Sequence, residues 1–287
     1  MKFGDDKPSA ADSERLSDAV DRVNALKGQL TPPITTWDTE PAFDSDKDKS
    51  QFRKFEDACN SVKAFYAEQH EKQTVKFNIE ARIAFHSQKR ARICLIRCSD
   101  ASDPDTDVPQ IEHLLQTAEA MRRDGKPEWM QVVGLTHDLG KLLSFFGTDG
   151  QWAVVGDTFV VGCKFDERDS KDPVYSTVNG FYAAGCGLDN VMLSWGHDEY
   201  LYHVFREQSS LPEEGLAMIR YHSFYPWHRE GAYMHLMDSR DYKHLEAVRA
   251  FNPYDLYSKS NERVRVAELK PYYQNLIAKF FPNEIDW

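Results

Sequence analysis

Apolar side chains recur at intervals of three and four residues over most of the chain after about residue 50. In the segment 51–66 they fall at Phe52, Phe55, Ala58, Val62, Phe65 and Tyr66. The segment 111–121 repeats this spacing and is followed by Gly125. An α-helix turns once per 3.6 residues, so this spacing places one apolar stripe on each helix. Such stripes are buried by packing helix against helix, and the sequence therefore predicts an all-α fold.

Further segments share this spacing, and we expect helices at 128–146, 176–184, 188–207, 212–224, 240–250, 253–260 and 268–280. The break before the helix at 253–260 rests on Asn252 and Pro253, because Asn caps helices well and Pro suits the first helical position. The segment 152–161 has two β-prone runs around Gly156 and Asp157. It predicts one small β-hairpin or tight loop within the helical bundle.

The beginning of the chain differs from the rest in composition. It carries Pro32, Pro33, Pro41 and the charged run "DSDKDKS". Such a composition is typical of segments without a packed core. We therefore expect a mobile or wrapping leader over 1–48, with a short helix at 12–27, and a single helical domain over 49–287.

Composition and charge exclude several classes of protein. The formal net charge is −11, which repels a polyanion and argues against a nucleic-acid partner. The five cysteines are odd in number and show no CxxC pair, so no disulfide framework is expected. No apolar run of 18 residues occurs and the first residues are polar, which predicts neither a membrane span nor a signal peptide. We expect a cytoplasmic protein.

The stretch "VVGLTHDLGKLL", residues 132–143, places His137 and Asp138 among apolar side chains. Burying such groups is costly unless something binds them. Neighbouring helical residues point about 100° apart, so both side chains can hold one ion, and the carboxylate has a second oxygen for another. Lys141 lies on the same helix face, and Gly140 leaves room for a backbone or a substrate. The stretch predicts a metal site.

Four more residues of ligand type follow apolar helical runs, namely His113, His197, His222 and Asp255. Together with the His-Asp pair they form a nitrogen and oxygen set suited to iron, manganese or zinc, large enough for two ions that share Asp138. The sequence leaves one ambiguity, because Asp198 could ligate in place of its neighbour. His203 lies six residues after position 197, which excludes the HExxH pattern of zinc peptidases.

Seven motifs occur in order along the chain: "QTAE", "VGLTHDLGK", "QWAVVGDTF", "SWGHDEY", "HSFYPWH", "YDLYSK" and "LKPYYQNLI". Together they resemble the myo-inositol oxygenase family, which belongs to the HD-domain superfamily of helical metal proteins. The resemblance runs from about Ser50 to Trp287. It implies an HD-domain-like helical bundle. It also implies a di-iron oxygenase that cleaves the ring of myo-inositol with dioxygen to give D-glucuronate and water.

The resemblance assigns the ligands of two iron ions, which are mixed-valent Fe(II)/Fe(III) in the active form. One ion would be held by His113, His137, Asp138 and Asp255. The other would be held by His197 and His222, with the Asp138 carboxylate bridging the two. The resemblance thus favours His197 over Asp198.

The resemblance also implies a polar pocket for an uncharged substrate with many hydroxyl groups. The substrate-binding positions would be Arg53, Asp100, Ser102, Lys141, Gly156, Asp157, His222, Ser223 and Lys259. Lys141 would reach a coordinated substrate oxygen and act catalytically with His137 and Asp138. Tyr66, together with Arg53, matches a lid, and closure protects radical chemistry from water.

Two other functions fit the same ligand types. An HD-domain phosphohydrolase would use the metals to activate water for attack on phosphorus. It needs a cationic clamp, for which the sequence offers Lys141 and Lys259, with Arg220 expected on another helix face. A metal-dependent interaction domain without turnover is the third. For the oxygenase, the expected partners are myo-inositol and dioxygen, and we expect a monomer.

Overall fold

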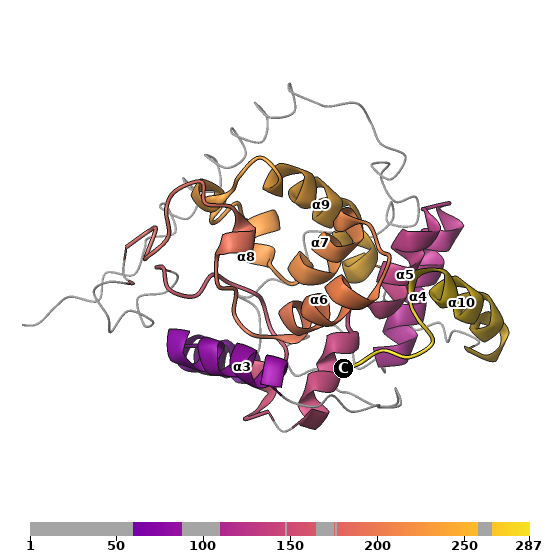
Figure 1. Cartoon of the computed structure of the whole chain (residues 1–287), viewed down its shortest axis with the longest axis horizontal. Helices are drawn as coiled ribbons and strands as arrows, with labels where there is room; N and C mark the ends of the chain where they lie inside the picture. Colours follow the sequence, from indigo (N-terminus) through magenta and orange to yellow (C-terminus); the bar gives the residue numbers. More distant parts are fainter. Residues whose placement is uncertain (1–59, 88–109, 147, 165–174, 176, 258–265) are drawn as a thin grey trace, which may run out of the picture. The chain divides into compact units, whose positions relative to one another are not determined.

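The computed structural model describes residues 60–87, 110–146, 148–164, 175, 177–257 and 266–287, and Figure 1 shows their arrangement. The α-helices are α2 (Asn60–Lys72), α3 (Val75–Ser87), α4 (Gln110–Arg123), α5 (Glu128–Thr136), α6 (His197–Gln208), α7 (Glu213–Tyr221), α8 (Tyr225–His228), α9 (Asp241–Tyr257) and α10 (Val266–Phe280). Four 3-10 helices are η4 (Leu139–Phe146), η5 (Gln151–Ala153), η6 (Leu188–Asn190) and η7 (Met234–Leu236). This part of the chain confirms the predicted all-α class.

Two sets of helices meet at the core. Helix α4 packs along α5, which also contacts α10, while α6 packs on α7 and α7 on α9. Helix α5 joins the two sets through contacts with both α7 and α9. The approach of α4 and α5 requires a small residue, because a methyl group at Gly134 would lie 3.0 Å from the Met121 sulfur and 3.2 Å from the Ala118 Cα. The close fit brings His113 of α4 near the end of α5.

The predicted helix 128–146 is in fact two helices with a turn between them. Helix α5 ends at Thr136, and the 3-10 helix η4 begins at Leu139. His137 and Asp138 occupy the junction and so lie at a helix end, contrary to the mid-helix position expected from the sequence. A change of helix type turns the chain. It seats Gly140 against the start of α6, where a methyl group would meet the His197 carbonyl oxygen at 1.8 Å.

Of the two forms predicted around Gly156 and Asp157, the hairpin is wrong and the tight loop is confirmed. The segment begins in the 3-10 helix η5, turns through Val154 and Gly156, and forms one isolated antiparallel bridge between Val160 and Leu193. Its backbone groups find partners elsewhere: the Ser194 amide donates to Phe159 at 2.8 Å, and the Thr158 amide donates to the Ser223 carbonyl at 2.8 Å. The two β-prone runs therefore pair with distant segments and not with each other.

Three predicted helix boundaries are also wrong. Among residues 177–184 the chain forms turns, since Gly180 takes a φ of 56° that favours glycine. In the segment 188–207 only η6 and α6 are helical. Helix α9 runs through Pro253 without a break. Burial explains that continuity, because Phe251 and Tyr254 on either side of Pro253 are completely buried.

Several predictions fall on residues outside the described ranges. These are the leader 1–48 with its helix at 12–27, the start of the helical segment after residue 50, and the boundary between leader and domain. None of the described helices combines the length and apolar character needed to cross a membrane.

Candidate metal centre

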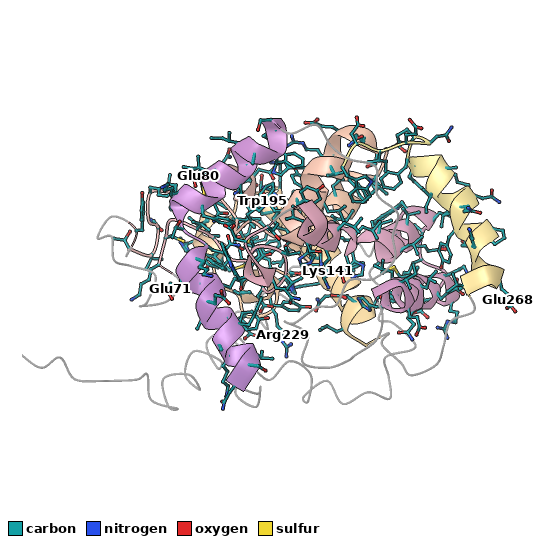
Figure 2. The ribbon with its side chains drawn as sticks, turned by 90° about the horizontal axis from the view of Figure 1, so that it is seen from below. Glu71, Glu80, Lys141, Trp195, Arg229 and Glu268 are labelled. Carbon is teal, nitrogen blue, oxygen red and sulfur yellow. The ribbon has the colours of Figure 1, made fainter. Side chains whose placement is uncertain are left out.

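Five elements bring the six predicted ligands to one place in the core. His113 comes from α4, and His137 and Asp138 follow the last residue of α5. His197 is the first residue of α6, His222 follows the last residue of α7, and Asp255 lies near the end of α9. All six side chains are buried, and His137 is completely inaccessible. Figure 2 shows Lys141 among these elements in the interior, whereas Glu71, Glu80 and Glu268 lie at the periphery.

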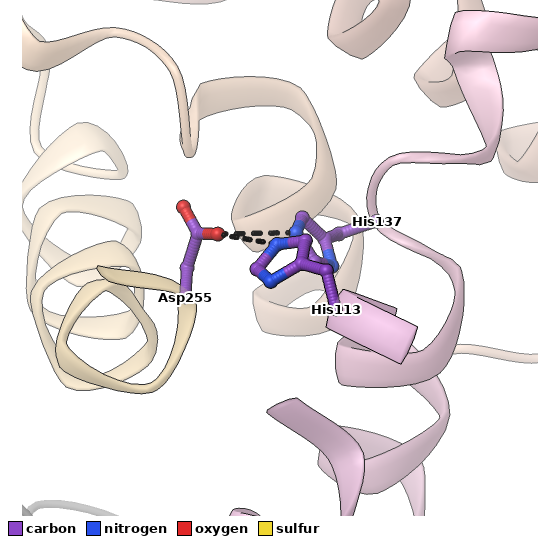
Figure 3. Close-up of side chains that lie close together, drawn as sticks. All are labelled: His113, His137 and Asp255. Atoms are coloured by element: carbon purple, nitrogen blue, oxygen red, sulfur yellow. Dashed lines mark hydrogen bonds and ion pairs between the residues drawn. The ribbon is translucent and has the colours of Figure 1, made fainter. Parts of the chain in front are cut away.

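His113, His137 and Asp255 form the first group. The Nε2 atoms of His113 and His137 lie 3.1 and 3.3 Å from Oδ1 of Asp255 (Figure 3). The three ligand atoms are close enough to share one ion, although His113 and Asp255 are 142 residues apart in the sequence.

Asp138 stands between this group and a second pair of histidines. Its Oδ2 atom lies 3.7 Å from the His113 Nε2 and 3.6 Å from the His137 Nε2. Its Oδ1 atom lies 3.3 Å from the His197 Nε2 and 3.5 Å from the His222 Nε2. Each oxygen of one carboxylate thus faces a different histidine pair. That is the geometry of a carboxylate able to bridge two ions.

In three of the histidines, a hydrogen bond at Nδ1 leaves Nε2 as the ring nitrogen that faces the centre. The Nδ1 atoms of His137, His197 and His222 lie 3.0, 2.9 and 2.8 Å from the backbone carbonyl oxygens of Gly134, Val154 and Ile219. A carbonyl can only accept, so each Nδ1 carries the hydrogen. In the neutral form each ring then presents the Nε2 lone pair, the usual arrangement of a metal-binding histidine.

The chain's own polar groups leave part of these lone pairs unsatisfied. The buried Nε2 of His137 makes no hydrogen bond within the described part of the chain. The Nε2 atoms of His197 and His222 face each other at 3.1 Å, which places two acceptors in contact. A buried polar atom without a partner is costly, and a cation between the rings removes that cost. The donor set therefore fits a metal ion.

The carboxylates of the centre are held in the ionised form. Burial alone would raise the pKa of Asp138, but the Lys141 ammonium at 2.9 Å and the adjacent histidines hold that pKa well below its usual range. Burial opposes ionisation of Asp255 as well. When no metal is bound, the rings of His113 and His137, protonated at Nε2, would face this carboxylate and hold its pKa well below the usual range. A bound cation would act in the same direction as these groups.

A polar turn lies beside the second histidine pair. The Thr158 amide donates to the Ser223 carbonyl, and the Ser223 hydroxyl lies 3.2 Å from the His197 Nε2. On the other side of the turn, the Tyr66 hydroxyl donates to the Asp157 carboxylate at 3.0 Å. The predicted positions Tyr66, Asp157 and Ser223 are thereby linked. Arg53, Asp100, Ser102 and Lys259 lie outside the described ranges.

Helix α2 holds this turn with a residue that the sequence analysis did not single out. The Gln69 side-chain amide donates to the carbonyl oxygens of Val155 and Asp157 at 3.1 and 3.4 Å. Gly156 takes a φ of 100°, and a methyl group there would lie 2.7 Å from the Gln69 amide nitrogen. The turn is thus shaped by a glycine and a glutamine together. A lone Gln in an apolar stripe gives no signal of this role.

Two further contacts could be recognised only in three dimensions. The Thr158 hydroxyl donates to the Asp198 carboxylate, which also accepts from the Glu199 amide at 2.9 Å. The Asp198 carboxylate is therefore engaged by Thr158 and by the first turn of α6, and it is His197 that faces Asp138. The Tyr225 hydroxyl donates to Oδ2 of Asp255 at 3.4 Å. Its position in the motif "HSFYPWH" was the only sequence signal for that contact.

An all-α core that gathers three further histidines and one further aspartate around a His-Asp pair defines an HD-type protein with buried groups able to hold metal. The comparisons with known proteins narrow this class. A family described as "Myo-inositol oxygenase" matches residues 59–287. The chain belongs to the myo-inositol oxygenase family.

Relatives from distant organisms agree with this assignment. A probable inositol oxygenase of Oryza sativa subsp. japonica is 47% identical over 269 residues, which cover 85% of this chain and 87% of the relative. The inositol oxygenase of Dictyostelium discoideum is 44% identical over 270 residues, which cover 85% of this chain and 92% of the relative. The inositol oxygenase of Rattus norvegicus is 42% identical over 264 residues, which cover 84% of this chain and 92% of the relative.

Proposed function

We propose that this chain cleaves the ring of myo-inositol with dioxygen, giving D-glucuronate and water, at a centre for two iron ions. The observation that carries the proposal is the Asp138 carboxylate, whose two oxygens face two different histidine pairs. A site for one ion needs no such arrangement. The first ion would be held by His113, His137, Asp138 and Asp255, and the second by Asp138, His197 and His222.

The reaction balances without an added reductant. Four electrons leave the substrate as one ring bond breaks, one oxygen atom enters the product, and the other becomes water. Iron in the mixed-valent Fe(II)/Fe(III) state, when bound there, would supply the one-electron chemistry that activation of dioxygen needs. The family membership and the relatives' names support this choice of substrate and metal.

The chain's own residues would orient the substrate and control its charge. Lys141 is buried, with its ammonium 2.9 Å from Asp138, so it can stabilise negative charge on a substrate hydroxyl that approaches the centre. Gly156, Asp157, His222 and Ser223 line the side from which a polyol could receive hydrogen bonds. We propose that Arg53, Asp100, Ser102 and Lys259 complete that pocket.

The burial of the centre would exclude water while the substrate is open to side reactions. We propose Tyr66 as part of the lid, because its hydroxyl already reaches Asp157 from α2. We further propose that the protein acts as a monomer in the cytoplasm, without a nucleic-acid partner. The net charge of −11 supports the last point.

The first test is stoichiometric. Iron-loaded, partly reduced protein should take up dioxygen when myo-inositol is added and should form glucuronate in equal amount. Dioxygen uptake would be measured with an oxygen electrode, and glucuronate would be assayed in the same reaction mixture. No uptake by protein shown to hold two irons would contradict the proposed chemistry.

An HD-domain phosphohydrolase remains the alternative, and the same protein would be tested on nucleotides. One observation weighs against it. Arg220, the guanidinium nearest to His222 in the sequence, is engaged by Glu199 at 2.8 Å and by Asp189 at 2.6 Å. A phosphate clamp cannot use an arginine whose donors are already committed. Release of phosphate without activity on inositol would favour the alternative.

Tyr66→Phe tests the lid. The change removes one hydrogen bond to the Asp157 carboxylate, worth about 1.5 kcal/mol, so we expect KM for myo-inositol to rise roughly tenfold. The metal content and kcat should stay close to wild type. Tyr273→Phe is the matched control, because its hydroxyl also donates to a carboxylate, that of Glu119 at 2.7 Å. Equal KM values for Tyr66→Phe and wild type would remove Tyr66 from the lid.

A further inference from the structure

The second histidine pair is supplied by the ends of two helices. His197 opens α6 and His222 follows the last residue of α7. The ends of a helix have fewer backbone hydrogen bonds than its middle, so they tend to fray. An ion bound between His197 and His222 needs these two ends at a fixed separation.

A buried ion pair joins the same two helices close to both ends. Glu199 lies two residues after His197, and Arg220 lies two residues before His222. The Arg220 Nε donates to Oε2 of Glu199 at 2.8 Å, and its Nη2 donates to Oε1 at 3.3 Å. Two parallel hydrogen bonds fix the direction as well as the distance of approach. Both residues are at least 95% buried.

The pair belongs to a larger network of charges. Arg82 of α3 donates to Oε1 of Glu199 at 3.2 Å, and Arg220 also donates to Asp189 at 2.6 Å. Asp189 in turn pairs with Arg240 at 3.3 Å, so the network continues from the buried pair to the surface. The Arg220 guanidinium also lies 4.4 Å from the centre of the Tyr202 ring, which restricts its plane.

A third side chain packs against the pair from within α6. The His203 Nε2 lies 3.3 Å from Oε1 of Glu199, which places this carboxylate between His203, Arg82 and Arg220. A buried ion pair contributes little to stability compared with well-packed apolar residues. Its place between the two ligand-bearing helices is better explained by the geometry that it imposes.

We propose that Glu199 and Arg220 are positioning residues that hold His197 and His222 at the separation required by the second metal ion. The first ion does not depend on them, because His113, His137 and Asp255 come from helices that carry neither residue of the pair. This inference rests on the proposed function, since it presupposes a centre for two metals.

The test measures metal binding and not only turnover. Full-length wild type, Glu199→Gln and Arg220→Lys would be titrated with Fe(II) without oxygen, and bound iron per chain would be determined after desalting. Wild type should hold two ions. Each variant should keep the first ion with unchanged affinity and bind the second at least tenfold more weakly. After partial oxidation, each variant should lack the electron paramagnetic resonance signal of a coupled mixed-valent pair.

Asp189→Asn is the matched control. It removes the other carboxylate partner of Arg220 and leaves the contact with Glu199 in place. We expect this variant to keep two ions and the coupled signal. Loss of the second ion in Asp189→Asn would show that any disturbance near Arg220 has the same effect and would overturn the specific role of the pair.

Three other outcomes of the iron titration would refute either the positioning role or the two-metal centre. Wild type that binds two ions, with both variants doing so at unchanged affinity, would refute the positioning role and leave the proposed function intact. Wild type that binds only one ion would refute the two-metal centre itself. Arg220→Lys keeps the charge and loses only the planar fork, so its failure to fold, or its loss of both ions together, would show a general structural role and would also overturn the inference.

Discussion

Asp138→Asn should abolish the two-metal centre. The substitution keeps the size of the side chain but replaces one of two negatively charged oxygens by a nitrogen that carries hydrogen atoms. The ion on that side then loses a ligand, and the charge that both ions share is gone. We expect bound iron to fall from two ions per chain to one or none. Ring cleavage should fall at least about a thousandfold, the equivalent of about 4 kcal/mol in the transition state.

The neighbouring residue supplies a control for Asp138→Asn. Asp198 is also a buried aspartate beside a centre histidine, but its oxygens accept from Thr158 and from the Glu199 amide. Asp198→Asn should therefore keep two ions per chain, although it weakens the start of α6. Metal analysis and circular dichroism of both variants would separate lost ligation from lost folding. Two ions in Asp138→Asn would show that this carboxylate is not shared.

The sequence predicts which residues could bind metal, but it does not predict which of them lie close together in the fold. A His and an Asp among apolar residues indicate that something binds them, whatever the fold. Nothing local relates His113 to Asp255, which are 142 residues apart and meet at 3.1 Å. In the sequence, only the resemblance to the family's ordered motifs assigned both residues to one metal site.

The errors in the predicted elements share one physical cause. Periodicity reports which side chains will be buried, and it does not report how the chain changes direction between elements. The apolar run 128–146 looks continuous, yet its helix stops at Thr136 and turns at the His-Asp pair. The β-prone runs at 152–161 are buried as expected, but their backbone groups bond to Met192, Ser194 and Ser223. In both segments, contacts with residues distant in the sequence determine where the chain turns.

Buried polar side chains that support the centre were the least predictable part. Glu199 and Arg220 look like ordinary charged residues on amphipathic helices, where most such residues face water. Their separation of 21 residues in the sequence carries no signal of a contact. Gln69 is similar, because its role depends on the carbonyl oxygens of a turn 86 residues away.

Gly140→Ala should be the most destabilising single methyl group that can be added near the centre. Position 140 has an ordinary negative φ, so alanine is not disfavoured by its own backbone. The added methyl would lie 1.8 Å from the carbonyl oxygen and 2.6 Å from the carbonyl carbon of His197. Backbone atoms cannot rotate away, so η4 and the start of α6 must separate. We expect the free energy of unfolding to fall by at least about 3 kcal/mol.

The same displacement should be visible in metal binding, because η4 carries Lys141 and α6 begins with His197. Gly140→Ala should therefore bind its second ion more weakly even where it remains folded. Gly125→Ala is the matched control: at φ 65° it strains the backbone by roughly 1–2 kcal/mol, but its methyl group would meet nothing within 4 Å. Chemical denaturation and iron titration of both variants would check these expectations. A Gly140→Ala protein no less stable than Gly125→Ala, with two ions bound, would contradict the close approach of η4 and α6.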